Sequence, residues 1–324
     1  MATFNGERFI LEQLRSLADQ EVLPTELVVC DDQSTDATVD IIETFARTAP
    51  FAVRIYRNET RLRFSENFMK AIGLCRERYI AFCDQDDIWH PSKIAKSVES
   101  LRSSGALMCS HRVDLIDQHG ALLGSSSNRS AEMMLRGSTF SPWGVFLGFT
   151  CTIDNRLLQL IDPTNRPRDL IEYDKPMSHD RWFYFVAATF GAVSYIDEPL
   201  ALYRQHDRNV FGRTRNTIID RLRKTARKYP AYIDQRATIA SEVVSLLNRA
   251  QGHSTSAELA DSCGRWRQVA EFYTARRRIF SQPNMYRRMR QFVLAYRRDQ
   301  YHAGWGRGGT RLMVQDMLAT MIVR

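Results

Sequence analysis

The 324-residue chain is 44% hydrophobic and 25% charged, an ordinary globular composition with ample length for a core. No window approaches the ~20 consecutive apolar residues of a membrane span, and the N-terminus lacks the pattern of a signal peptide. Six cysteines are scattered without a CxxC pair, so neither a zinc site nor a disulfide framework is indicated. A reducing cytosol is the expected compartment.

The charge is unevenly distributed along the chain. Residues 211–324 hold 22 Lys and Arg against 8 Asp and Glu, a net charge of +14. The other 210 residues hold 23 basic and 29 acidic side chains, a net charge of −6. An acidic body and a basic tail suggest two parts with different partners.

Helices and strands are expected to alternate through the body. Hydrophobic periodicity predicts helices at 7–20, 33–47, 65–75 and 90–103, and strands at 26–32, 51–58, 79–84 and 106–117. Ser34 or Thr35 is the expected N-cap of the second helix. This order indicates an α/β fold with a mostly parallel sheet flanked by helices. In such sheets, ligands bind at the carboxyl ends of the strands.

Carboxylates follow two of these strands. Asp31 and Asp32 end the first, and Asp84, Asp86 and Asp87 follow the strand at 79–84. One such cluster alone is more simply a solvated loop with a helix cap. Two clusters at strand ends favour a divalent cation, Mn²⁺ or Mg²⁺, which relieves carboxylate repulsion and takes further ligands from phosphate. No GxxxxGK[ST] or GxGxxG motif is present, which argues against a P-loop ATPase or a Rossmann dehydrogenase.

The basic tail is expected to be helical. Helical spacing covers 216–229, 232–250 and 284–301, with breaks at Pro230, Gly252 and Pro283. The third helix has an apolar and aromatic face ringed by arginines. Such a helix lies on an anionic membrane surface or packs on the body with its arginines in solvent, and both interpretations stay open.

Several motifs together resemble family 2 glycosyltransferases, in particular the rhamnosyltransferase-like group of bacterial polysaccharide synthesis. They are "ATFNGERFILEQLRSLADQ", "VVCDDQSTDATVDII", "NFMKAI", "YIAFCDQDDIWHPSKI", "SHDRWF" and "YIDEPLALYRQHDRNVFG". The resemblance covers about residues 2–212. It implies a GT-A fold, a nucleotide-sugar donor linked to UDP, dTDP or GDP, a divalent metal, and inversion at the anomeric carbon. It also implies a saccharide or lipid-linked acceptor, and a cytoplasmic enzyme that works at or near the inner face of the membrane.

The resemblance assigns donor-binding roles to five residues near the start of the chain. Ala2, Thr3 and Asn5 stand where the first nucleotide-contacting loop lies. Asp32 stands where an aspartate binds the pyrimidine ring, with Asp31 beside it.

Five further residues would surround the donor's ribose, metal and diphosphate. Asp84, Asp86 and Asp87 occupy the DxD-type site, where the carboxylates hold the ribose and the metal. Asp86 or Asp87 is the expected direct metal ligand. Arg204 and His206 match the segment that closes over the diphosphate, and two cations side by side favour such a contact.

Asp180, in "SHDRWF", matches the catalytic base of the family. It precedes an apolar helical stretch, so the residues alone read more simply as a helix cap, where the dipole stabilises an anion. A carboxylate can still serve as a general base toward a sugar hydroxyl.

The chain departs from the family pattern in two places. The family has an apolar strand before the position of Ala2, whereas this chain starts at Met1, so the first strand is expected to be missing. Arg63 stands where relatives usually have glycine. The expected division is a GT-A catalytic domain at 1–212 and a basic helical region at 213–324.

Two other functional classes compete with glycosyl transfer. A metal-dependent nucleotidyltransferase would use the same sheet and metal, but it needs no acceptor base such as the one "SHDRWF" supplies. A non-catalytic nucleic-acid binder would use the basic tail and show steep salt dependence. That class leaves the strand-end carboxylates unexplained, so no nucleic-acid partner is expected.

Overall fold

The computed structural model describes residues 1–125, 133–136, 141–206, 218–251, 257–298 and 307–322. The chain groups into two compact units, one of Met1–Pro163 with Ser178–Gly212 and one of Thr164–Met177 with Arg213–Arg324. The expected boundary at 212/213 falls outside the described residues, and two separate domains stay a prediction. Thr164–Met177, expected in the first region, groups with the tail. Its Arg168 is bound to Glu242 of the tail through both the backbone N–H and the guanidinium, at 2.9 Å each.

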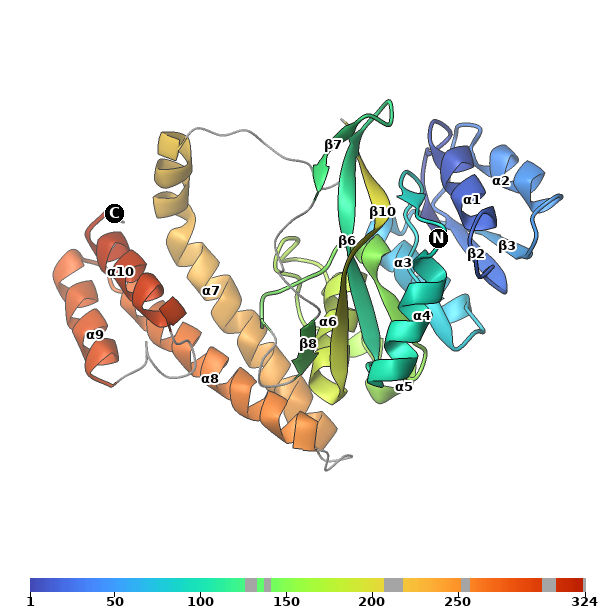
Figure 1. Ribbon diagram of the computed structural model, residues 1–324. Coiled ribbons are helices and arrows are strands. Elements are labelled where there is room, and N and C mark those ends of the chain that lie inside the picture. The colour runs from blue at the N-terminus through green and yellow to red at the C-terminus, as the bar shows by residue number, and fades with distance from the viewer. Residues whose placement is uncertain (126–132, 137–140, 207–217, 252–256, 299–306, 323–324) are drawn as a thin grey trace. The chain divides into compact units, whose positions relative to one another are not determined.

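The first unit alternates strands and helices (Figure 1). Its elements are β1 (Ala2–Thr3), α1 (Ile10–Ala18), β2 (Glu26–Asp31), α2 (Thr38–Ala46), β3 (Ala52–Arg57), α3 (Arg63–Leu74), β4 (Tyr79–Ala81), β5 (Ile88–Trp89), α4 (Lys93–Ser104), β6 (Met108–Asp117), β7 (Leu122–Ser125), β8 (Met133–Arg136), β9 (Thr152–Asp154), α5 (Leu157–Leu160), α6 (His179–Phe190) and β10 (Ala192–Gln205). The expected alternation from β2 to β6 is therefore present.

The strands form two sheets. One has the order β1-β2-β3 with every pair parallel. The other has the order β4-β9-β6-β10-β5, with β7 on β6 and β8 on β10, and among its described strands only β6 and β10 pair in parallel. At the start of β1, the amino group of Met1 donates to the carbonyl of Val28 at 2.7 Å.

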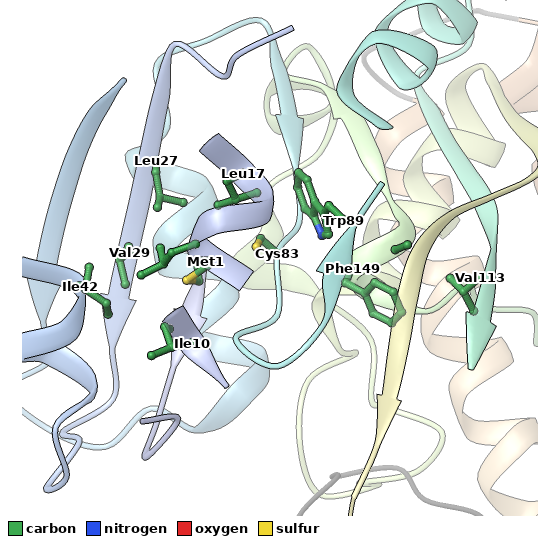
Figure 2. Packing of buried hydrophobic residues seen from close by; sticks show 12 residues of the cluster. Met1, Ile10, Leu17, Leu27, Val29, Ile42, Cys83, Trp89, Val113 and Phe149 are labelled. Atoms are coloured by element: carbon green, nitrogen blue, oxygen red, sulfur yellow. The ribbon is translucent and has the colours of Figure 1, made fainter. Parts of the chain in front are cut away.

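The core of the first unit packs α1 and α2 on the parallel sheet and extends to Trp89 of β5 and Val113 of β6 in the second sheet (Figure 2). Ile10 and Leu17 of α1 pack with Val29 of β2 and Ile42 of α2, all of them at most 2% exposed. Leu11, which follows Ile10 in α1, is 39% exposed. The apolar stripe of α1 is thus narrower than its sequence suggests, because the sheet covers only one side of the helix.

The N-cap prediction for α2 is wrong. The helix begins at Thr38, with Ala37 at the cap position. Ser34 instead donates its hydroxyl to Asp31 at 2.5 Å, within the loop that follows β2. The carboxylate of Asp36 accepts the backbone N–H of Thr38 at 3.0 Å and does the work of a cap.

The tail, which makes up most of the second unit, is helical in its described part. It contains α7 (Ile218–Gln251), α8 (Ala257–Phe280), α9 (Met285–Arg297) and α10 (Arg307–Ile322). The break expected at Pro230 is wrong, since α7 continues through it. Tyr229 and Ile233 are buried on either side of Pro230, and this packing outweighs the ~3 kcal/mol that an interior proline costs. The break at Pro283 is confirmed between α8 and α9, and Gly252 lies outside the described residues.

None of the described helices combines the length and apolar composition that crossing a bilayer requires.

Candidate active site

The acidic loop, residues 84–87, lies between β4 and β5. Its three carboxylates have different surroundings. Asp87 is 1% exposed, and its Oδ1 accepts the backbone N–H of Arg204 at 3.1 Å. Its Oδ2 is buried with no hydrogen-bond partner among the described residues. Asp86 is partly exposed, and its Oδ2 lies 2.8 Å from Nε2 of His206. An unpaired buried carboxylate oxygen beside a second carboxylate is an arrangement that a cation would satisfy.

The raised pKa values of the carboxyl groups in the acidic loop also favour a cation site there. Burial, followed by the charges of Asp86 and Asp180, raises the pKa of Asp84 to about 7. Burial and the charges of Asp86 and Asp84 raise the pKa of Asp87 well above its usual range. Asp180 is therefore close enough for its charge to act on the acidic loop, although about 95 residues separate them in sequence. Perturbed carboxylates of this kind gather at functional sites.

Gln85, inside the acidic loop, joins it to the loop after β1. The side-chain amide of Gln85 accepts the backbone N–H of Phe4 at 2.9 Å and donates to the carbonyl of Phe4 at 3.1 Å. A Cβ at Gly6 would lie 2.3 Å from Oε1 of Gln85, so this contact requires glycine there. The side chain of Gln85 thus ties the two loops together through two hydrogen bonds.

The residues expected in the first nucleotide loop lie next to β2. Ala2 pairs in register with Cys30, and the hydroxyl of Thr3 donates to Asp31 at 2.9 Å. Asn5 has a positive φ of 47°, and its side-chain oxygen accepts the backbone N–H of Thr35 at 2.9 Å. All three therefore lie at the carboxyl edge of the parallel sheet.

Asp32 is 2% exposed and holds the turn into α3. Its carboxylate accepts the backbone N–H groups of Leu62 at 2.6 Å and Arg63 at 2.8 Å, as well as the side-chain amide of Asn58 at 2.9 Å. Asp31 is equally buried and accepts bonds from Thr3 and Ser34. Both carboxylates thus hold the loops at the carboxyl edge of the parallel sheet.

Arg63 occupies the left-handed region at the start of α3, with a φ of 66°. Replacing it with glycine should raise the free energy of unfolding by about 0.5–1 kcal/mol, because a non-glycine residue there costs ~1–2 kcal/mol, less the unfolded-state entropy of glycine. The N–H bond to Asp32 is kept in this variant. Chemical denaturation measures the change. Arg63→Ala keeps the backbone strain and should stay at wild-type stability, so an equal gain in both variants would locate the effect in the side chain.

Asp180 lies in the first turn of α6, beside a tightly packed turn. Its Oδ1 accepts the N–H of Arg181 at 2.7 Å. A Cβ at Gly148 would lie 2.9 Å from Nε2 of His179 and 3.6 Å from the Cβ of Asp180. Glycine at this position lets the 3₁₀ turn Gly148–Thr150 approach the start of α6 closely, which fixes where Asp180 stands.

Arg204 and His206 lie against the acidic loop from the end of β10. The guanidinium of Arg204 is 2% exposed, donates to Glu12 at 2.5 Å and to the carbonyl of Asp86 at 3.0 Å, and lies over the ring of Phe9. The His206 ring stacks on Phe9 with 5.0 Å between centroids. Arg204 thus binds protein acceptors directly and supports the acidic loop through the carbonyl of Asp86.

Lys93, which the sequence interpretation did not assign, is a buried cation beneath this site. It is 0% exposed, its Nζ donates to the carbonyl of Phe149 at 2.6 Å, and it lies 3.5 Å from the centroid of the Trp89 ring. Burial lowers the pKa of the Lys93 amine to about 7. A lysine three residues after "IWH" at a helix start was the available signal, but surface lysines are common at such positions.

Comparison with known proteins identifies the family. Residues 1–158 match the family described as Glycosyl transferase family 2. The dTDP-rhamnosyl transferase RfbG of Shigella flexneri is 30% identical over 224 residues, which are 65% of this chain and 73% of that relative. The chain belongs to glycosyltransferase family 2. The predicted family resemblance, with its rhamnosyltransferase-like character, is confirmed.

Two further proteins are similar to this glycosyltransferase at lower identity. An uncharacterized protein of Mycobacterium bovis is 28% identical over 217 residues, and the match spans 58% of that relative's length. The crystal structure of S. aureus TarS residues 1–349 in complex with UDP-GlcNAc superposes with a TM-score of 0.55 at 17% identity, covering 93% of this chain and 91% of TarS 1–349. That likeness confirms the predicted GT-A fold.

Proposed function

We propose that this glycosyltransferase moves a sugar from a nucleotide-diphosphate donor to a hydroxyl of a saccharide or lipid-linked acceptor, with inversion at the anomeric carbon. The reaction would serve cell-surface polysaccharide synthesis, in the cytoplasm or at the inner membrane face. The observation that carries the proposal is the proximity of Asp180 to the acidic loop, residues 84–87. The neighbouring ring of His179 packs edge-on against Phe82 with 5.7 Å between centroids, and the charge of Asp180 raises the pKa of Asp84. A donor site and a base for the acceptor would thus be adjacent.

The acidic loop fits a divalent cation held by one or two carboxylates. Asp86 and Asp87 would hold Mn²⁺ or Mg²⁺, and the buried unpaired Oδ2 of Asp87 supports that assignment. Among the described residues no group of three acidic, histidine or cysteine side chains is arranged for a metal. A Mg²⁺ site completed by water and donor phosphates needs only one or two protein ligands. When bound, the cation would neutralise charge on the departing diphosphate.

The chain's own residues would bind the donor and take up the acceptor's proton. The acceptor oxygen bonds to the anomeric carbon, the bond to the diphosphate breaks, and its electron pair leaves with the diphosphate. Asp180 would accept the acceptor's proton on the opposite face. The nucleotide would be bound at the carboxyl edge of the parallel sheet by Ala2, Thr3, Asn5, Asp31 and Asp32. Arg204 and His206 would act from the end of β10, where they contact Asp86 and Asp87.

The first donor to test is dTDP-rhamnose, because RfbG is named a dTDP-rhamnosyl transferase. UDP- and GDP-linked sugars follow in the same screen, each with Mn²⁺ and with Mg²⁺. Released nucleotide measures turnover, and transfer with none of these donors would contradict the proposal.

Removing the proposed metal ligands should abolish metal-dependent donor binding. We expect Asp86→Ala and Asp87→Ala to weaken that binding by about 100-fold or more, since losing even a supporting contact to a metal ligand costs ~10–100-fold. Neither should lose much stability, because each substitution relieves repulsion in the loop. Asp87→Asn keeps an acceptor for the N–H of Arg204 and separates charge from hydrogen bonding.

Calorimetry with and without Mn²⁺ measures the donor affinity of each variant. Asp197→Ala is the matched control, because its carboxylate is 37% exposed and pairs only loosely, at 3.7 Å, with Arg112. Wild-type donor affinity in both alanine variants in the presence of metal would remove the acidic loop from the metal site.

A further inference from the structure

Helix α10 is packed with its apolar stripe outward. Val314, Met317, Leu318 and Met321 follow the i, i+3, i+4, i+7 spacing of one helical face, and they are 42%, 38%, 49% and 52% exposed. A helix that packs on a core ordinarily buries that face. Two of the three buried positions in the described part of α10 are instead polar, Asp316 and Thr320 at 0% exposure, and the third is Ala319.

The reason for this inversion is a buried ionic contact. The guanidinium of Arg276 in α8 donates to both carboxylate oxygens of Asp316, at 2.7 and 2.9 Å. The hydroxyl of Tyr229 in α7 donates to the same carboxylate at 2.7 Å. These bonds hold the Asp316 side of α10 inward. The apolar stripe on the opposite side therefore faces solvent while the helix stays packed.

Helix α9, which packs against α10, presents a second apolar and basic surface (Figure 1). A shallow groove on it is lined by Tyr286, Met289, Arg290, Val293, Leu294 and Arg297. Tyr286 is 79% exposed and Leu294 is 37% exposed. Large apolar groups gathered on neighbouring helices in this way mark an interaction surface.

The exposed charged side chains of α9 have one sign. Residues 285–298 contain five arginines and no acidic residue, and four of these arginines are exposed, with only Arg288 buried. The described part of α10 has one acid, Asp316, which is buried against Arg276. The exposed surface therefore offers guanidinium groups and apolar side chains together.

We propose that α9 and α10 dock this glycosyltransferase onto an anionic phospholipid surface. The apolar side chains would enter the boundary between headgroups and acyl chains, and the arginines would bind lipid phosphates. A second copy fits less well, because arginines would face arginines. A nucleic acid would satisfy the arginines but leave Met317 and Leu318 in water.

The lipid surface is related to the proposed function, because a lipid-linked acceptor is one of the two acceptor classes proposed above. Vesicle binding needs neither donor nor acceptor. A protein that does not bind vesicles could still transfer sugar, so that result would contradict only the lipid surface. A protein that does not transfer sugar could still bind vesicles, so that result would contradict only the proposed reaction.

The test is cosedimentation of the full chain with vesicles of phosphatidylcholine alone or with 25% phosphatidylglycerol. We expect binding to the anionic vesicles, weakening as salt rises. The pair Arg290→Gln/Arg297→Gln should weaken partitioning by about 30-fold, from the contribution of each basic residue near such a surface. The pair Met317→Gln/Leu318→Gln should weaken it by about tenfold through lost apolar burial.

Matched pairs from the first unit serve as controls. Arg15→Gln/Arg47→Gln removes the same charge, and Leu122→Gln/Leu123→Gln replaces leucines that are 69% and 58% exposed. Both should bind like wild type.

Three results would overturn the proposal. One is equal binding to neutral and anionic vesicles. Another is a wild-type dimer in light scattering that the Met317/Leu318 pair dissociates while lipid binding is unchanged. The third is a lowered melting temperature for that pair with wild-type lipid binding, which would mean that the stripe packs within the protein.

Discussion

Replacing Asp180 with asparagine is expected to lower kcat by about 10²–10⁴-fold while donor affinity changes little. The substitution keeps the shape and the acceptor oxygen that binds the N–H of Arg181, but it removes the group that would take the acceptor's proton. It also removes a negative charge near Asp84. Donor binding should therefore be unchanged or slightly tighter. Calorimetry gives the affinity, and released nucleotide gives the rate.

Variants of two other carboxylates distinguish the loss of a catalytic base from a general loss of negative charge. Asp174 is highly exposed, so Asp174→Asn should turn over at the wild-type rate. Asp169 is buried and accepts the backbone N–H groups of Ile171 and Glu172, so its role is to hold a turn. A near wild-type rate for Asp180→Asn would take Asp180 out of the mechanism and make Asp174 and Asp169 the next residues to test.

Replacing Asp316 with alanine should lower the free energy of unfolding of the helical unit by about 3–5 kcal/mol, because Arg276 would be left as an unpaired buried charge. Arg276 is 1% exposed and Asp316 is 0% exposed, so water cannot replace the missing carboxylate. The hydroxyl of Tyr229 would lose its acceptor as well. Denaturant unfolding followed by circular dichroism measures the loss.

The charge can be tested apart from the packing. A triple variant, Arg276→Met with Asp316→Leu and Tyr229→Phe, removes all three polar partners and should recover most of the lost stability. An exposed pair in the same helices is the control: Asp234→Ala breaks a 3.7 Å contact with Arg277 and should cost ~0–1 kcal/mol. If Asp316→Ala costs no more than Asp234→Ala, the buried ion pair does not hold α10 in place.

Local pattern was sufficient to predict most elements of the first unit and the position of its carboxylates. The periods of 2 and 3.6 residues depend on neighbours in the chain, so β2, β3, α3 and β6 lie where the sequence predicts them. The end of a strand is equally local, and this is why the acidic loop was expected at a sheet edge. The cap of α2 was predicted wrongly, because the Ser34 hydroxyl donates to Asp31 in the preceding loop and Asp36 accepts the backbone N–H of Thr38.

Contacts between distant residues decided the rest. The sequence by itself determined the family motifs, the helical tail and its charge. The tertiary structure decided that α7 passes through Pro230, that Arg204 binds Glu12 at the edge of the acidic loop, and that α10 turns its polar side inward. Each outcome depends on partners 40 or more residues away, such as Asp316 for Arg276 and Glu12 for Arg204. Propensity and periodicity contain no information on such partners, whose burial and charge outweigh the local preference.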